Sequence, residues 1–206
     1  MTEPKAPDDA SPARERILAA ALEEFATRGY EAASTNAIAA RAGVAKGLVF
    51  HHFGSKEALF EVLFEREVVR LTQLVLEPQG APATELFERL HQVTLRKLEL
   101  AEQYPLTAEF LVVAITEAPP SLKPKLALRQ AQLLKESWPK LIAGIDPSPL
   151  RDGLSLGDAV ETVGFLAEGL EKQLTAMMKS RTLTMSEVAA RAWRHFERLR
   201  DGLYRR

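Results

Sequence analysis

Apolar residues recur three and four positions apart along most of the chain, which is the spacing of amphipathic α-helices. The first such stripe has four members: Ile17, Ala21, Leu22 and Phe25. Ser11-Pro12 precedes this stripe and places a cap residue before a proline at the first helical position. Gly29 follows it and is expected to end the helix in a left-handed conformation.

Three further helices are predicted before the first long break. Ser34 can cap a helix over about residues 35–42, and a third helix is expected over about residues 44–53. Ser55 can cap a fourth helix, which should end before Pro78-Gln79-Gly80. The apolar stripe of this fourth helix is Leu59, Phe60, Leu63, Phe64, Val68 and Leu71.

Helical spacing continues beyond that break. Helices are expected to open at Thr84 and at Pro105. After the interruption at Pro119-Pro120, a long helix should reach Ile142, with Pro139 bending or ending it late.

The last third of the chain begins with a loop. Residues 144–157 are rich in Pro, Gly and Asp, and two long helices are expected over about residues 157–180 and 185–204. Thr184 and Glu187 have the spacing of a capping box at the start of the final helix. Because no segment alternates with period two, the predicted fold is all-α with about nine helices.

The composition excludes some classes of function but does not identify one. The 206 residues are 46% hydrophobic and 27% charged, with a formal net charge of -1, and the chain contains no cysteine. Disulfides, thiol nucleophiles and zinc–thiolate sites are therefore excluded. No apolar run reaches the roughly 18 residues of a membrane helix, and the start of the chain lacks a hydrophobic signal core. We expect a cytoplasmic protein with a mobile tail over residues 1–10, no membrane partner, no metal site and no cofactor.

One segment departs from this balance of charges. Residues 32–56 contain no acidic residue, but they carry Arg41, Lys46, His51, His52 and Lys56. Two short helix signals lie in this segment and are joined by a tight turn at Ala42-Gly43-Val44, as in a helix-turn-helix. A locally basic surface in a chain of nearly zero net charge predicts contact with the phosphate backbone of a nucleic acid. The simpler interpretation is a small helical corner with a solvated basic edge.

The third predicted helix has two unlike faces. At about 100° per residue, Ala45, Val49 and Phe53 fall on one side and should pack inward. The other side is nearly uncharged, as expected of a face that enters a DNA groove, and consists of Gly47, Leu48, Phe50 and His51. The predicted DNA-contact residues are Ser34, Thr35, Ala45, Lys46, Gly47, Leu48, Phe50, His51, His52 and Lys56. A metal site at His51-His52 is disfavoured because adjacent helical residues point about 100° apart.

The run from Arg14 to Phe64 resembles the DNA-binding region of the TetR/AcrR family of one-component bacterial regulators. The matching features are Gly29-Tyr30, Ser34, Ile38-Ala39, Ala42-Gly43-Val44, Lys46-Gly47, Phe53 and Ser55-Lys56-Glu57. The resemblance implies a three-helix DNA-binding domain over residues 11–57 and a larger helical ligand-binding and dimerisation domain over residues 58–206.

Five positions depart from the family pattern. The family often has Ser, Thr, Leu, Tyr and Tyr where this chain has Ala45, Leu48, Val49, Phe50 and His52. The missing hydroxyl at Phe50 removes a phosphate hydrogen bond that His51 and His52 can supply. With these departures we still expect the third helix to dock on DNA as in the family, but the sequence does not predict which bases it prefers.

The resemblance implies that the second domain binds a small molecule and dimerises through its last two helices. Candidate pocket residues combine bulky apolar groups with a few polar ones: Phe87, Leu90, His91, Thr94, Phe110, Val113, Glu117, Trp138, Phe165 and Met177. This mixture favours a mainly apolar effector, although the same side chains can form plain core. Candidate dimer residues are Val160, Val163, Gly164, Ala167, Leu170, Leu174, Ala192, Trp193, Phe196 and Leu199. They can instead pack on their own subunit.

These features predict a ligand-responsive transcriptional regulator that binds a near-palindromic operator in double-stranded DNA as a homodimer. Repression, relieved by the small molecule, is the expected mode, and activation is the alternative. An enzyme is disfavoured because the possible acid–base groups His91, Glu117 and His195 have no recognisable catalytic spacing. A helical adaptor whose basic corner binds protein is a further alternative, which salt-dependent retardation of duplex DNA would separate from the regulator.

Overall fold

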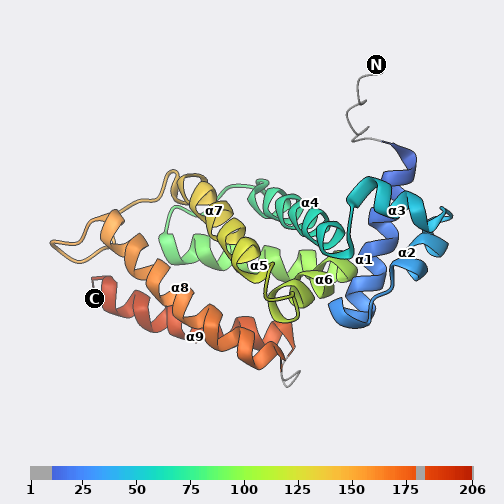
Figure 1. Ribbon diagram of the computed structural model, residues 1–206. Helices are drawn as coiled ribbons and strands as arrows, with labels where there is room; N and C mark the ends of the chain where they lie inside the picture. Colours follow the sequence, from blue (N-terminus) through green and yellow to red (C-terminus); the bar gives the residue numbers. More distant parts are fainter. Residues whose placement is uncertain (1–10, 180–183, 206) are drawn as a thin grey trace, which may run out of the picture. The chain divides into compact units, whose positions relative to one another are not determined.

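The computed structural model of the protein describes residues 11–179 and 184–205. In these ranges the chain forms nine α-helices, which Figure 1 labels in chain order. The only β-type pairing in these ranges is the isolated bridge between Leu150 and Tyr204. The prediction of an all-α fold is confirmed. The tail predicted over residues 1–10 lies outside the described residues.

The helices follow the predicted order with small shifts at their ends. Their bounds are α1 Pro12–Ala32, α2 Thr35–Ala42, α3 Lys46–Phe53, α4 Lys56–Leu76, α5 Leu86–Gln103, α6 Pro105–Thr116, α7 Lys123–Ile142, α8 Leu156–Lys179 and α9 Met185–Leu203. None of the described helices is long and apolar enough to span a bilayer.

The caps predicted for α1, α4 and α9 are present, the one at α4 being Ser55, whose hydroxyl accepts the N–H of Ala58 at 3.0 Å. The Ser11 hydroxyl accepts a hydrogen bond from the Arg14 N–H at 3.2 Å, and Thr184 and Glu187 form the predicted capping box. Ser34 is the N-cap residue of α2, but its side chain makes no capping hydrogen bond. At α5, the carboxylate of Glu85 accepts the N–H groups of Phe87 and Glu88, so Glu85 serves this helix in place of Thr84.

The described residues divide into two compact units. The first contains residues up to Leu71 together with Tyr104–Gln132, and the second contains Thr72–Gln103 together with residues from Leu133 onward. Helices α4 and α7 each contribute one part to either unit. The helix-turn-helix therefore shares its unit with α6 and with the first half of α7.

Three phenylalanines form the centre of the first unit. Phe60 on α4 meets Phe25 on α1 at a ring-centroid distance of 4.9 Å and Phe110 on α6 at 5.1 Å, both in edge-on geometry. All three side chains are fully buried. Burial of each stabilises the fold by about 1.5–3 kcal/mol, and the edge-on contacts add to this. They fix α1 and α6 against the fourth helix.

Gly29 bends α1 near its end. Its backbone has φ 71° and ψ 177°, a conformation that is open essentially only to glycine. A side chain at this position would also overlap the carboxylate of Glu117. Gly29 thus interrupts the helix at the predicted position, and a short second helical stretch beyond the kink continues to Ala32.

The second unit has its own core, made from α5, α8, α9 and the loop before α8. Its buried members are Leu86, Phe87, Ile145, Leu150, Ala159 and Val163. Arg89 lies beside this core and is almost fully buried. Its guanidinium donates to the carbonyl oxygens of Ala83 at 2.8 Å and Leu141 at 3.0 Å, which satisfies the end of α7 and joins it to α5.

Candidate nucleic-acid interface

Helix α3 is held by one face and exposes the other. Val49 and Phe53 are buried in the core of the first unit, as the helical wheel predicts. On the opposite side Gly47 and His51 are exposed, and Phe50 is 39% exposed. This face of α3 presents the Phe50 ring and, at Gly47, backbone that no side chain covers, which is a shape that can enter a groove of DNA.

One inward residue of the wheel was placed wrongly. Ala45 is exposed because α3 begins only at Lys46, and Ala45 is its extended N-cap with φ -66° and ψ 142°. The helical angle of about 100° per residue does not apply to a residue outside the helix. Its exposure leaves Ala45 accessible, as its place among the predicted contact residues requires.

The turn between α2 and α3 is set by Gly43. This residue adopts the left-handed conformation, with φ 64° and ψ 40°, and its N–H is donated to the final turn of α2. The N–H of Val44 donates to the carbonyl of Ala39 at 3.0 Å, which completes a glycine C-cap. The angle at which α3 leaves α2 therefore depends on a residue without a Cβ atom.

A buried carboxylate supports the start of α2. Glu24 on α1 is 1% exposed and accepts the backbone N–H of Ser34 at 3.1 Å and the guanidinium of Arg41 at 3.2 Å. A buried charge needs such partners. Sequence reasoning missed this role because nothing local separates Glu24 from a solvent-facing residue. The backbone N–H of Ser34 is therefore already used in a hydrogen bond within the protein, to Glu24.

The two predicted phosphate-binding lysines have different surroundings. Lys46 is exposed, and its Nζ lies 5.8 Å from the centroid of the Phe50 ring. Lys56 donates to the carbonyl of Glu31 at 3.1 Å and lies 4.7 Å from the centroid of the Tyr30 ring. Burial, followed by the charges of Glu57 and Glu31, raises the pKa of Tyr30 above its ordinary value. Lys46 is therefore the better placed of the two to reach a phosphate.

The ten predicted contact residues lie in or beside α2 and α3. None of them is buried, and Leu48, His52, Thr35 and Lys56 are half-buried. The His51 and His52 ring centroids are 5.6 Å apart at 66°. Among the described residues, no group of three or more His, Asp or Glu side chains could hold a metal ion.

The candidate acid–base residues are distributed over both units. Glu117 belongs to the first unit, and His91 and His195 belong to the second. His91 stacks on Trp193 with a centroid distance of 4.5 Å. Neither histidine is fully exposed.

The candidate effector residues are similarly divided. Phe110, Val113 and Glu117 lie in the first unit, the first two of them in its core. In the second unit Phe87 is buried, whereas Phe165 is 69% exposed. The remaining described members are half-buried: Leu90, His91, Thr94 and Trp138. The side chain of Met177 lies outside the described residues.

Several of the candidate dimer residues pack inside their own chain. Val163 and Leu170 are buried, and Val160, Trp193, Phe196 and Leu199 pack against the second core. Gly164, Ala167 and Ala192 are half-buried, and the side chain of Leu174 is not described.

Comparison with known proteins identifies the family to which this region belongs. The family model for bacterial regulatory proteins, tetR family, matches residues 17–63, which run from α1 into α4. The HTH-type transcriptional repressor Rv3405c of Mycobacterium tuberculosis is 34% identical over 130 residues, which are 59% of this chain and 69% of that protein. The HTH-type transcriptional repressor AcnR of Corynebacterium glutamicum is 38% identical over 70 residues, which are 34% of this chain and 37% of that one.

Solved structures share the fold over nearly the whole length. NalD, the secondary repressor of the MexAB-OprM multidrug efflux pump in Pseudomonas aeruginosa, superimposes with a TM-score of 0.60 at 22% identity, over 95% of this chain and 99% of its own. A TetR-like transcriptional regulator from Rhodococcus sp. RHA1 gives a TM-score of 0.60 at 20% identity, over 94% and 99% of the two chains.

Proposed function

Because the chain belongs to the TetR family of bacterial regulatory proteins, we propose that it represses transcription as a homodimer on a near-palindromic operator. A small, mainly apolar molecule releases it from the DNA. The observation that carries the proposal is the exposed face of α3, which has no acidic residue and has Lys46 at its first turn.

In this proposal each subunit places α3 in the major groove. Gly47 has no neighbour within 4 Å of the position of a Cβ atom, so its backbone can approach a base edge or a phosphate closely. Leu48 contacts a thymine methyl group, and Lys46 contacts a phosphate. His51 and His52 add hydrogen bonds that the family makes with hydroxyl groups.

Dimerisation through α8 and α9 supplies the two-fold symmetry. Support comes from the apolar residues of these helices and from Phe165, whose side chain is 69% exposed in the single chain. The two copies of α3 then read half-sites about 34–36 Å apart, or at a spacing that a bent operator can match.

The effector releases the protein from DNA if the effector and the operator favour different arrangements of the two α3 helices of the dimer. Helix α4 follows α3 after the two residues Gly54 and Ser55, so a displacement of α4 moves the recognition helix directly. Coupling of about 1–3 kcal/mol is typical of such systems and changes operator affinity by about 5- to 150-fold. A repressor of this kind acts in the cytoplasm, where the DNA is.

The test is to select bound duplexes from a random library and to footprint the selected site. The proposal expects two inverted half-sites, protection on one side of the duplex and a complex containing two or four chains. Selection of no shared sequence, or binding by single chains to an asymmetric site, would overturn it.

A further inference from the structure

Phe50 is one of two exposed phenylalanines in the described part of the chain. All nine phenylalanines lie in that part, and besides Phe50 only Phe165 is exposed. Phe165 lies on α8 and belongs to the dimer contact of the proposed function. Phe50 lies on α3, the proposed recognition helix, and is 39% exposed. Its ring therefore offers apolar contact area to whatever α3 docks against.

Two glycines lie one turn from Phe50, one on either side of it along the chain. Gly47 precedes it by three residues, which places the two on one face of α3. Gly54 follows it by one turn and donates its N–H to the Phe50 carbonyl at 2.8 Å. The space that a Cβ atom would enter is open at both glycines. A base edge can therefore approach the exposed ring without meeting a side chain at these two positions.

Lys46 lies beside the same ring. It precedes Phe50 by four residues, and its Nζ is 5.8 Å from the ring centroid. The lysine is exposed, and residues 32–56 contain no acidic residue. This face of α3 thus combines an apolar ring with a positive charge, which suits a base edge beside a phosphate.

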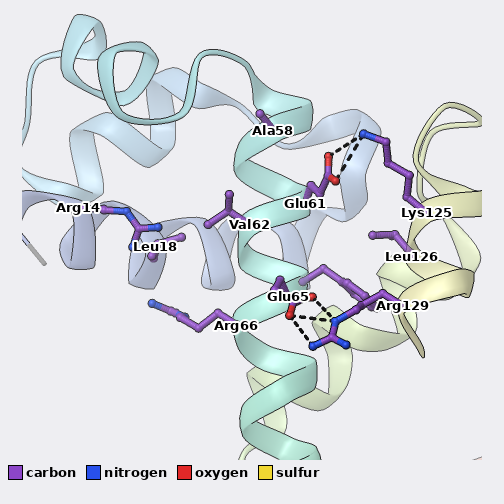
Figure 2. A pocket seen from close by; sticks show the side chains of 11 residues that line it. Arg14, Leu18, Ala58, Glu61, Val62, Glu65, Arg66, Lys125, Leu126 and Arg129 are labelled. Carbon is purple, nitrogen blue, oxygen red and sulfur yellow. Dashed lines mark hydrogen bonds and ion pairs between the residues drawn. The ribbon is translucent and has the colours of Figure 1, made fainter. Parts of the chain in front are cut away.

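The groove between α1, α4 and α7 in the same unit differs, because its charges are matched within the chain (Figure 2). In Figure 2 the carboxylates of α4 point toward the cations of α7. Each rim cation has a carboxylate partner: Lys125 has Glu61, Arg129 has Glu65, Arg14 has Glu15 and Arg66 has Glu67. This groove therefore shows no preference for a charged partner, in contrast to the exposed face of α3.

A phenyl ring can distinguish thymine from the other bases in the major groove. The ring has no donor or acceptor for hydrogen bonds, and thymine alone presents an apolar group there, its C5 methyl. Against the polar edge of adenine, guanine or cytosine, the ring would displace water and form no hydrogen bond in its place. The contact is thus favourable with thymine and unfavourable with the other three bases.

We propose that Phe50 determines specificity by selecting a thymine in each half-site through the C5 methyl group. The inference rests on the proposed function, because it requires α3 to lie in the major groove. Lys46 binds a neighbouring phosphate and so holds the ring over the base. 5-Methylcytosine carries a methyl group at the same place and can replace thymine against the ring, whereas cytosine cannot.

The test uses the duplex that the wild-type protein selects, with each thymine replaced in turn by uracil. Uracil keeps the O4 acceptor and lacks only the methyl group. At one thymine of a half-site the wild type should lose about 4-fold in affinity, the loss expected for one buried methyl group, and about 15-fold when both half-sites are substituted. Phe50→Ala should bind the thymine and uracil duplexes equally at this position and keep any penalty at the other thymines.

Leu48→Ala is the matched control, since it is another apolar truncation on the same helix. It should keep the uracil penalty that Phe50→Ala removes. A second pair of duplexes carries cytosine or 5-methylcytosine in place of the same thymine, opposite guanine. The wild type should prefer the methylated duplex by about 4-fold, and Phe50→Ala should not distinguish the two.

The outcomes separate this inference from the proposed function. A selected operator without a uracil penalty at any thymine, or a Phe50→Ala variant that keeps every penalty, overturns the role of Phe50 and leaves the repressor proposal standing. Failure of the wild type to select any shared sequence overturns the repressor proposal and this inference with it.

Discussion

The carboxylate of Glu24 and the backbone N–H of Ser34 are joined by a 3.1 Å hydrogen bond, although ten residues separate them in the chain. The same carboxylate binds Arg41 at 3.2 Å from inside the unit. The bond connects α1 to the residue that begins α2, and the last turn of α2 is tied to the same point through Arg41. The buried side chain of Glu24 therefore holds both the start and the last turn of α2, the helix that precedes α3.

Replacing Glu24 should destabilise the first unit and disturb its DNA contact. Glu24→Leu leaves the Ser34 N–H and Arg41 without their acceptor, so the free energy of unfolding should fall by about 1–3 kcal/mol, with weaker operator binding. Glu24→Gln retains a neutral acceptor and should lose less. Urea denaturation and DNA titration measure both effects.

Glu23→Gln is the matched control for this experiment. Glu23 pairs with Arg41 at 3.4 Å, but its side chain is 47% exposed, so its loss should change stability by no more than about 1 kcal/mol. A Glu24→Leu variant as stable as Glu23→Gln would refute the assigned role of the buried carboxylate.

Gly29→Ala should be strongly destabilising because of its backbone. A non-glycine residue is strained at φ 71°, ψ 177°, whereas the Glu117 carboxylate that its Cβ atom would meet is the end of a flexible, exposed side chain and can move aside. The expected loss is about 1–3 kcal/mol by thermal or urea unfolding. Because the Glu117 side chain can move aside, Gly29→Ala/Glu117→Ala should recover little of the loss, and full recovery would show that the collision, not the backbone strain, causes it.

Gly47→Ala should separate stability from DNA binding. This glycine lies in α3, no atom lies within 4 Å of an added Cβ, and alanine is the better helix former by up to about 1 kcal/mol. The variant should be at least as stable as the wild type yet bind the operator more weakly, because the methyl group would lie between backbone and DNA. Unchanged operator affinity would mean that the α3 backbone does not closely approach the duplex.

Tyr204 should make the stability of the second unit sensitive to alkaline pH. Burial and its hydrogen bond to Glu85 raise the pKa of Tyr204 above the ordinary 10.0. The neutral phenol is therefore favoured in the folded state. Its contribution is complete below about pH 10 and is lost as the pH rises toward the higher folded pKa.

Tyr204→Phe checks this pH dependence. Below pH 10 the variant should be less stable than the wild type, because it lacks the hydroxyl that donates to Glu85. Above pH 10 the difference should shrink, as the unfolded wild-type chain gains stability by releasing the phenol proton. A difference that stays constant through this range, measured by urea unfolding, contradicts the assignment.

Helix positions could be predicted because their signals are local. Ser11, Thr184 and Glu187 act within one turn of their own helix, and the caps predicted from their spacing are present. The inward positions of Val49 and Phe53 follow from helical periodicity in the same way. Ala45 shows the limit of this approach. Helical periodicity places it on the inward face of α3, but α3 begins one residue later, at Lys46, so the periodicity does not apply to Ala45.

Contacts between distant segments could not be predicted. Glu24 appears in the sequence as one of several glutamates, and only the approach of α1 and α2 makes it a buried acceptor. Glu57, Glu61 and Glu65 pair with Ser121, Lys125 and Arg129, each 64 residues away, because α4 and the start of α7 run side by side in the same direction. In the same way, nothing local to Lys56 indicates its contacts with Tyr30 and Glu31, which compete with a phosphate for its ammonium group.

The salt dependence of operator binding by Lys46→Ala tests the central claim, that the exposed face of α3 contacts duplex DNA. Lys140→Ala, with the same change in net charge on a helix outside the interface, is the control. If the claim holds, Lys46→Ala binds all sequences more weakly, and its log–log salt slope shrinks by about 0.9 for each phosphate that the variant no longer neutralises. A slope equal to those of the wild type and the control would contradict the claim.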